Sequence, residues 1–237
     1  MKITWFGHSA FRLEFGSSVV LIDPFLSGNP VFQGSVEQAS AGATHVLLTH
    51  GHADHVGDTV AICKATGAKL VTNYDLAMYL AKTGGLSNLD PMNSGGETDQ
   101  GEFSVAMTIA FHSSAEIDAN GVSQSLGHPT GLVVTPKDTA HPVVYHAGDT
   151  AVFSDMALID EFYRPKVAIL PVGDRFTMGP KHAALAVKRF LPSVETVIPC
   201  HYATFGLLLP DASGLVQAME GAKAKVLVPE RNKPFNL

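Results

Sequence analysis

Four potential metal ligands, His50, His52, Asp54 and His55, lie within six residues of one another. Imidazole nitrogens and carboxylate oxygens are ligands that divalent transition metals accept. The segment directly follows the apolar run 46–48, which predicts a short buried strand. Because a loop at the end of a strand can direct several side chains to one point, the pattern predicts a metal site. A surface loop that is merely rich in His and Asp is the alternative.

Three further residues of the same chemistry, His112, Asp149 and His201, each follow a predicted strand. The segment 103–112 alternates apolar with small or polar residues, which is the period of a β-strand. Residues at the carboxyl ends of strands usually form the sites of open sheets. We therefore expect these three side chains to converge with the cluster at 50–55. Taken singly, each could instead be an ordinary strand-end or turn residue.

The elements that must position these residues follow from periodicity and from turn residues. Strands are predicted at 3–5, 10–15, 19–22, 46–48, 69–72, 103–112, 130–135, 142–146, 167–170, 196–198 and 225–228. Helices are predicted at 59–65, 75–82, 155–162, 180–190 and 213–222, with loops at 24–43 and 87–100. This order favours a layered architecture with strands inside and helices outside. A plain doubly wound sheet is the alternative.

The composition restricts the class of protein. The chain has 237 residues, 46% of them hydrophobic and 16% charged, which suits one large domain or two tightly fused halves. A net charge of −6 argues against a nucleic-acid partner. The start has no signal-peptide pattern and no run of 18 apolar residues occurs, so we expect a cytoplasmic protein without a membrane partner. Cys63 and Cys200 are expected to be reduced thiols.

Taken together, the ligand pattern resembles the metallo-β-lactamase superfamily, whose hallmark His-x-His-x-Asp-His motif matches residues 50–55. The resemblance implies an α+β or α/β fold, a four-layer αββα sandwich, with residues 1–237 forming one domain of two fused ββα-type halves. It also implies two divalent metal ions, with zinc or manganese favoured and iron or nickel compatible. By the same resemblance, the first ion is held by His50, His52 and His112, the second by Asp54, His55 and His201, and Asp149 bridges both.

Within that superfamily, the start Gly7-His8-Ser9-Ala10-Phe11 is similar to a branch of prokaryotic metal-dependent hydrolases related to L-ascorbate 6-phosphate lactonase. The segments 108–114, 176–179 and 201–205 also resemble that branch. The candidate catalytic residues are then Asp54 and His8. His8 is interpreted as an extra metal ligand, a proton shuttle or a substrate contact, with a structural turn histidine as the alternative.

A second polar segment suggests where a substrate could bind. Arg175, Lys181 and His182 lie around Pro180, which suits the first turn of a helix. Exposed N–H groups at a helix start attract anions, so we expect a site for a substrate phosphate or carboxylate, with ordinary solvated charges as the alternative. Asp58 is a candidate for orienting a ligand histidine, and Cys200 for packing beneath the site. The remaining histidines are interpreted as structural or surface residues: His45, His128, His141 and His146.

The function expected from these features is hydrolysis by a metal-bound hydroxide at a dinuclear His/Asp site. The favoured substrate is a lactone or another ester of a small anionic metabolite, and a phosphodiesterase or nuclease is the alternative on the same site. A diiron redox enzyme is disfavoured because no room remains for a flavin domain. A non-catalytic metal-binding or regulatory protein stays open, as does a homo-oligomer.

Overall fold

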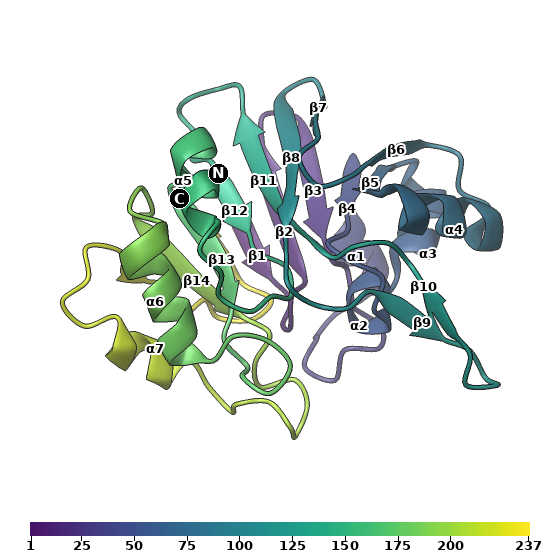
Figure 1. Ribbon diagram of the computed structural model, residues 1–237. Coiled ribbons are helices and arrows are strands. Elements are labelled where there is room, and N and C mark those ends of the chain that lie inside the picture. The colour runs from purple at the N-terminus through teal and green to yellow at the C-terminus, as the bar shows by residue number, and fades with distance from the viewer.

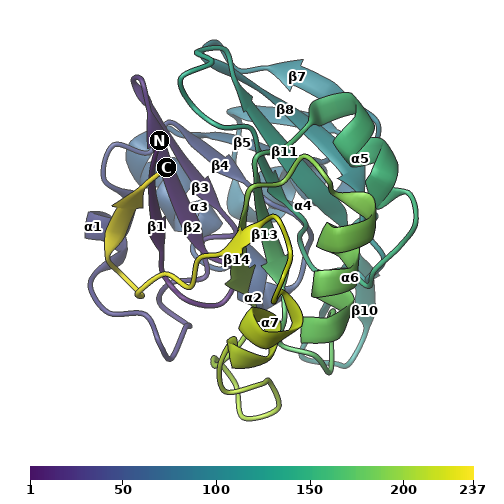
Figure 2. The ribbon, with the colours of Figure 1, turned by 90° about the vertical axis from the view of Figure 1, so that its left-hand side faces the viewer.

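The computed structural model describes residues 1–237 and contains two seven-stranded sheets that pack face to face (Figure 1). The first sheet has the strand order β16-β1-β2-β3-β4-β5-β6. Its strands are β1 (Lys2–Trp5), β2 (Phe11–Phe15), β3 (Ser18–Ile22), β4 (His45–Leu47), β5 (Lys69–Asn73), β6 (Leu89–Met92) and β16 (Pro234–Asn236). Because β16 pairs with β1, the two ends of the chain lie side by side (Figure 2).

The second sheet has the order β15-β14-β13-β12-β11-β8-β7. Its strands are β7 (Glu97–Asp99), β8 (Phe103–Ile109), β11 (Thr130–Pro136), β12 (Val144–His146), β13 (Val167–Pro171), β14 (Thr196–Cys200) and β15 (Lys225–Val226). A separate hairpin, β9 (Ala115–Ile117) and β10 (Ser123–Ser125), extends from the body of the molecule (Figure 1).

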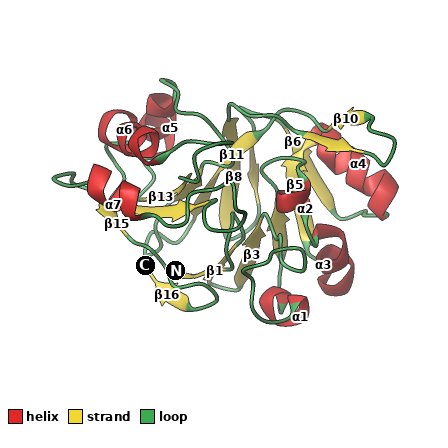
Figure 3. Cartoon of the chain, turned by 90° about the horizontal axis from the view of Figure 1, so that it is seen from below, coloured by secondary structure: helices red, strands yellow, loops and turns green.

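Helices cover both outer faces of the paired sheets, as Figure 3 shows. The first sheet is covered by α1 (Val36–Ser40), α3 (Thr59–Thr66) and α4 (Tyr74–Gly84), and the second by α5 (Met156–Tyr163), α6 (Pro180–Phe190) and α7 (Ser213–Ala218). The short helix α2 (Ala53–Val56) lies at the end of the first sheet. The four-layer αββα sandwich is therefore confirmed, and the doubly wound alternative is wrong.

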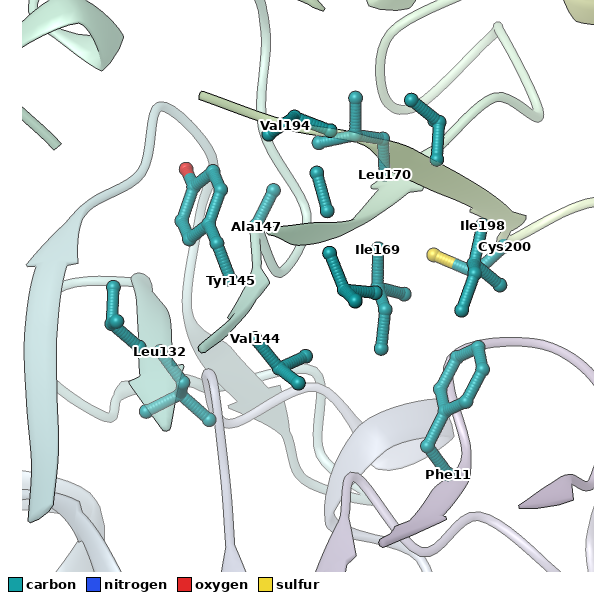
Figure 4. Packing of buried hydrophobic residues seen from close by; sticks show 14 of the residues in the cluster. Phe11, Leu132, Val144, Tyr145, Ala147, Ile169, Leu170, Val194, Ile198 and Cys200 are labelled. Carbon is teal, nitrogen blue, oxygen red and sulfur yellow. The ribbon is translucent and has the colours of Figure 1, made fainter. Parts of the chain in front are cut away.

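The main hydrophobic core lies between the two sheets and continues beneath α5, α6 and α7. It contains 42 buried residues, and Figure 4 shows Phe11 of β2 among side chains of the second sheet such as Ile169 and Ile198. In β8 every second side chain points into this core. Phe103, Val105 and Met107 are fully or almost fully buried there. Burial on this scale fixes the strand ends that carry the candidate ligands.

The loops expected at 24–43 and 87–100 contain regular structure. The first contains α1, which is capped by Ser35, the residue before the helix, whose hydroxyl accepts a hydrogen bond from the Gln38 N–H. The second contains the edge strands β6 and β7, whose residues are polar or only partly buried. These segments are strands because they pair with β5 and β8. They have no apolar face, so their composition alone resembles that of a loop.

Strand direction explains why the candidate ligands can meet. β1, β3 and β4 run in one direction in the first sheet, and β8, β12 and β14 share a direction in the second. Their carboxyl ends therefore lie along one edge of each sheet. No helix combines the length and the hydropathy needed to cross a membrane.

Candidate metal centre

All seven predicted ligands lie at the ends of those strands and come together in one cluster. Three sets have ligand atoms within 4.8 Å of one another: His50, His52 and His112; His8, Asp54, His55 and His201; and His50, His55 and Asp149. The third set shares a residue with each of the others. The centre is thus continuous from the first sheet to the second.

Separations between potential ligand atoms match those around a metal ion. His50 Nε2 lies 2.9 Å from His52 Nδ1, and Asp149 Oδ2 lies 2.9 Å from His201 Nε2 and 3.4 Å from His55 Nε2. Bonds of about 2.0–2.2 Å to one ion place neighbouring ligand atoms about 2.9–3.6 Å apart in octahedral or tetrahedral geometry. The cluster therefore has the dimensions of a coordination sphere.

Asp23 and Thr49 decide which nitrogen of His50 carries its proton. The Thr49 hydroxyl donates to Asp23 Oδ2 at 2.7 Å, because a carboxylate only accepts. The same hydroxyl lies 2.9 Å from His50 Nδ1, so Nδ1 must donate to it. His50 Nε2 is left with a lone pair directed into the cluster, as a metal ligand requires.

Asp23 has the same effect on His55. Its Oδ2 accepts a hydrogen bond from His55 Nδ1 at 2.8 Å, so Nε2 is the nitrogen of this ring that faces the cluster. His55 Nε2 and Asp149 Oδ1 are buried atoms without a hydrogen-bond partner. Unpaired buried acceptors are costly, and a bound cation would satisfy both. The residues present therefore fit a divalent metal.

The charges in the cluster also suit a cation. Burial lowers the pKa of His50, His52 and His112, so these imidazoles are neutral and offer lone pairs. Burial would raise the pKa of Asp149, but the neighbouring His201 and His55 hold it well below its ordinary value. Burial would lower the pKa of His55, but Asp149 and Asp23 hold it well above its ordinary value, so this imidazole would release a proton when a cation takes its place beside Asp149.

Comparison with known proteins agrees with this geometry. A family model described as a beta-lactamase superfamily domain matches residues 19–202. The chain belongs to the metallo-β-lactamase superfamily. A UPF0173 metal-dependent hydrolase of Methylobacterium nodulans is 56% identical over 98% of this chain and 97% of its own, and one of Methylocella silvestris is 54% identical over 97% of each.

Solved structures support the same assignment. Igni18, a metallo hydrolase from Ignicoccus hospitalis, is 34% identical, with a TM-score of 0.85 over 100% of this chain and 98% of its own. An isothiocyanate hydrolase from Delia radicum gut bacteria has a TM-score of 0.76 over 100% and 99% of the two chains, and at 23% identity it shows the fold alone. This member of the superfamily is a metal-dependent hydrolase with a His/Asp metal-binding group.

His8, predicted as a catalytic residue of this metallo-β-lactamase-fold protein, lies inside the cluster. Its Nε2 is 3.0 Å from Asp54 Oδ2, and its Nδ1 is 3.1 Å from Thr204 Oγ1. Burial lowers the pKa of His8 to about 4. Burial alone would raise the pKa of Asp54, but the hydrogen bond with His8 and the nearby His55 bring it below its ordinary value.

The prediction that Asp58 orients a ligand histidine is wrong. Its carboxylate accepts hydrogen bonds from the N–H groups of Leu26 and Ser27 and from the Ser27 hydroxyl, and it makes no hydrogen bond or ion pair with a histidine. Asp23 has that role instead, and the sequence analysis missed it. A signal was available, because Asp23 follows a predicted apolar strand in the same way as Asp149 does.

Two serines of the segment 108–114 support the hallmark motif of the superfamily. Ser114 Oγ accepts from the Gly51 N–H at 3.0 Å and donates to the Leu126 carbonyl at 3.1 Å. Ser113 Oγ lies 3.3 Å from His52 Nε2, the ring nitrogen opposite the one that faces His50. These contacts hold the loop between the two first histidines in place.

The candidate anion-binding residues are only partly brought together. Lys181 and His182 are exposed and line a pocket at the start of α6 together with Asp174. Arg175 does not line this pocket. None of the three cationic residues belongs to the metal-binding sets. The acidic Asp174 offsets part of the positive charge there.

The other residues singled out from the sequence have structural positions. Cys200 is buried at the end of β14, where burial raises the pKa of its thiol well above the ordinary value. His146 is buried against the Phe11 ring, and its Nδ1 accepts a hydrogen bond from the Gly148 N–H at 3.1 Å. His45, His128 and His141 lie outside the metal-binding sets, in keeping with their interpretation as structural or surface residues.

Proposed function

We propose that this metal-dependent hydrolase cleaves a lactone or another ester of a small anionic molecule at a dinuclear centre. The observation that carries the proposal is the position of Asp149. Its Oδ2 lies 3.5 Å from His112 Nε2, in the first ligand set, and 2.9 Å from His201 Nε2, in the second. One carboxylate therefore contacts both ligand sets, as a residue shared by two ions would.

The seven ligands divide into two sets around that carboxylate. His50, His52 and His112 would hold one ion, Asp54, His55 and His201 would hold the other, and Asp149 would bind both. When bound, two divalent ions such as zinc or manganese supply Lewis acidity and lower the pKa of coordinated water. The histidine and aspartate ligands, without thiolate, suit either metal.

The protein's own groups prepare this centre for hydrolysis. Asp23 and Thr49 keep protons on the Nδ1 atoms of His50 and His55, so the Nε2 atoms stay available. Asp54 and His8 contact each other within the cluster, where we place their catalytic role. Two bound dications would outweigh the carboxylates of Asp54 and Asp149, and a fixed centre of net positive charge stabilises a developing oxyanion without reorganising.

The anionic part of the substrate is assigned to the start of α6. Lys181 and His182 line a pocket there, next to the N–H groups of the first helical turn. A carboxylate or phosphate of the substrate would gain from both the side-chain charges and the helix dipole. Asp174 in the same pocket limits the size of that gain.

The test is turnover by protein reconstituted with zinc or manganese against lactones, carboxylic esters, thioesters, β-lactams and phosphodiesters, with proton release as the readout. We expect metal-dependent hydrolysis of lactones or carboxylic esters, with none by chelator-treated protein. Two metal ions per chain should accompany activity. Turnover confined to phosphodiesters would reject the substrate class, and activity at full rate with one ion would reject the dinuclear centre.

A further inference from the structure

A further pocket lies beside the end of β1, and it contains none of the candidate metal ligands. Its volume is about 360 Å³, and its walls come from Trp5, from Val31 and Gln33, from Tyr202 and from the segment 229–232. That segment leads into β16, which pairs with β1, so both ends of the chain contribute to the pocket (Figure 2).

Arg231 gives this pocket a positive charge that no carboxylate of the chain neutralises. The half-buried guanidinium lies over the Trp5 ring, 5.6 Å from its centroid, and takes part in no ion pair or hydrogen bond. Glu230 also lines the pocket, but its carboxylate pairs with Lys233 at 2.6 Å. A guanidinium stacked on an aromatic ring keeps the N–H groups at its edge free, and these groups bind oxyanions in a bidentate geometry.

Tyr202 adds a hydroxyl donor to the same pocket. The residue is only 4% exposed, its ring centroid lies 5.2 Å from that of Trp5, and its hydroxyl makes no hydrogen bond to another residue. Burial raises the pKa of Tyr202 to about 12, although the charge of Arg231 acts in the opposite direction, so the hydroxyl keeps its proton. Since a buried tyrosine hydroxyl usually has a partner, this one is available to an acceptor from outside the chain.

Backbone hydrogen bonds hold Arg231 in this position without the help of an ion pair. The Asn232 N–H donates to the Trp5 carbonyl at 2.7 Å, and the Lys233 N–H donates to the Glu230 carbonyl at 3.3 Å. Asn232 has φ +61°, a conformation that asparagine adopts more readily than most residues. The turn therefore fixes the guanidinium beside Tyr202, and a donor pair that is already in place loses less entropy when it binds a ligand.

We propose that this pocket binds the oxyanion group of a small molecule, either a carboxylate or a phosphate. Arg231 provides a pair of N–H donors, and the Tyr202 hydroxyl provides a third donor. A volume of about 360 Å³ suits a small molecule. The site goes beyond the proposed function, because it shares no residue with the metal-binding sets or with the pocket at the start of α6.

The pocket also adjoins the backbone of the metal centre. Trp5 Nε1 donates to the His8 carbonyl at 2.9 Å, and the same carbonyl accepts from the His201 N–H at 3.0 Å. Tyr202 directly follows His201 in the chain. Trp5 is the single tryptophan of the protein, so its fluorescence reports on this pocket.

The experiment titrates full-length, zinc-loaded protein with butyrate, inorganic phosphate and neutral butyramide at constant ionic strength, and it follows Trp5 fluorescence. We expect a saturable change with butyrate or phosphate and none with butyramide, and the anion with the lower Kd identifies the ligand group. Arg231→Gln should raise Kd at least about tenfold, and Tyr202→Phe about three- to tenfold. Arg189→Gln is the matched control, because Arg189 is an exposed arginine that lies 5.3 Å from the centroid of the Phe190 ring, and it should leave Kd unchanged.

The same titration of chelator-treated protein separates this site from the metal centre, and we expect an equal Kd. Loss of binding after metal removal would place the anion on the metal ions and overturn the proposal. Saturation by butyramide, no saturation by either anion, or a wild-type Kd in both Arg231→Gln and Tyr202→Phe would also overturn it. Tyr202→Phe removes only a hydroxyl without a protein partner, so its thermal unfolding should match that of wild type and its Kd stays informative if Arg231→Gln does not fold.

Discussion

The metal cluster and the pocket at the start of α6 both gather chemistry-bearing residues, but they differ in burial and in contacts. In the cluster, His50, His55 and Asp149 are buried, and their polar atoms face one another. In the pocket, Lys181 and His182 are exposed and make no side-chain hydrogen bond or ion pair. Buried polar groups need partners, whereas solvated charges are satisfied by water. The arrangement of the buried cluster is therefore stronger evidence of function than the arrangement of the exposed pocket.

The largest effect is expected from Asp149→Asn, at the residue that contacts both ligand sets. Asparagine keeps the shape but removes the negative charge that holds two cations together. Since metal ions contribute several kcal/mol to catalysis, we expect hydrolysis to fall at least about 10³-fold and metal content to drop below that of wild type. Metal analysis of the purified variant and its initial rates on the best substrate check this prediction.

Asp99→Asn is the matched control, because Asp99 is an exposed carboxylate paired with Lys137 at 2.8 Å. It should leave metal content and rate unchanged. If Asp149→Asn retained both metal ions and more than a tenth of the wild-type rate, Asp149 would be no more important for metal binding and hydrolysis than the exposed Asp99.

The convergence of the candidate ligands could be predicted from the sequence because their signal is local. Each of His50, His112, Asp149 and His201 follows a strand that periodicity or an apolar run identifies. The order of these strands within the two sheets has no such local signal. A layered architecture was predictable because most core strands are strongly apolar, whereas the four-layer αββα sandwich followed from the family resemblance.

Structural features that depend on contacts between distant parts of the chain could not be predicted from such local signals. β6 and β7 are strands because they pair with neighbouring strands. The short helix α2 forms on the segment that contains the candidate ligands Asp54 and His55. Asp58 is nearer to the motif in sequence than Asp23 is. Asp23 is nearer in space, since β3 and β4 are adjacent parallel strands whose ends meet.

A moderate effect is expected from Asp23→Asn, which tests how far the cluster depends on its hydrogen-bonded surroundings. Asparagine tolerates the φ of +45° at this position but offers one acceptor oxygen instead of two. His55 Nδ1, the Thr49 hydroxyl and the Thr49 N–H then compete for it. We expect metal affinity to fall about 10- to 100-fold and the free energy of unfolding to fall by about 1–3 kcal/mol.

Asp58→Asn separates these two effects. Its carboxylate also accepts three hydrogen bonds from nearby groups, but none comes from a histidine. Denaturant unfolding should therefore show some loss of stability, while chelator competition shows metal affinity close to that of wild type. Equal losses of metal affinity in the two variants would mean that general loop stability, and not the histidine tautomer, governs the centre.

The smallest effect is expected from Lys181→Ala in the exposed pocket. A solvated charge near a helix start contributes about 0.3–1 kcal/mol, so KM for a carboxylate-bearing ester should rise about two- to fivefold, with kcat unchanged. The neutral form of the same ester should show no change, and the difference should disappear in high salt. Lys137→Ala, at an exposed lysine that pairs with Asp99, is the control. An unchanged KM for the anionic ester would remove the pocket from the substrate site and leave the buried cluster as the sole source of recognition.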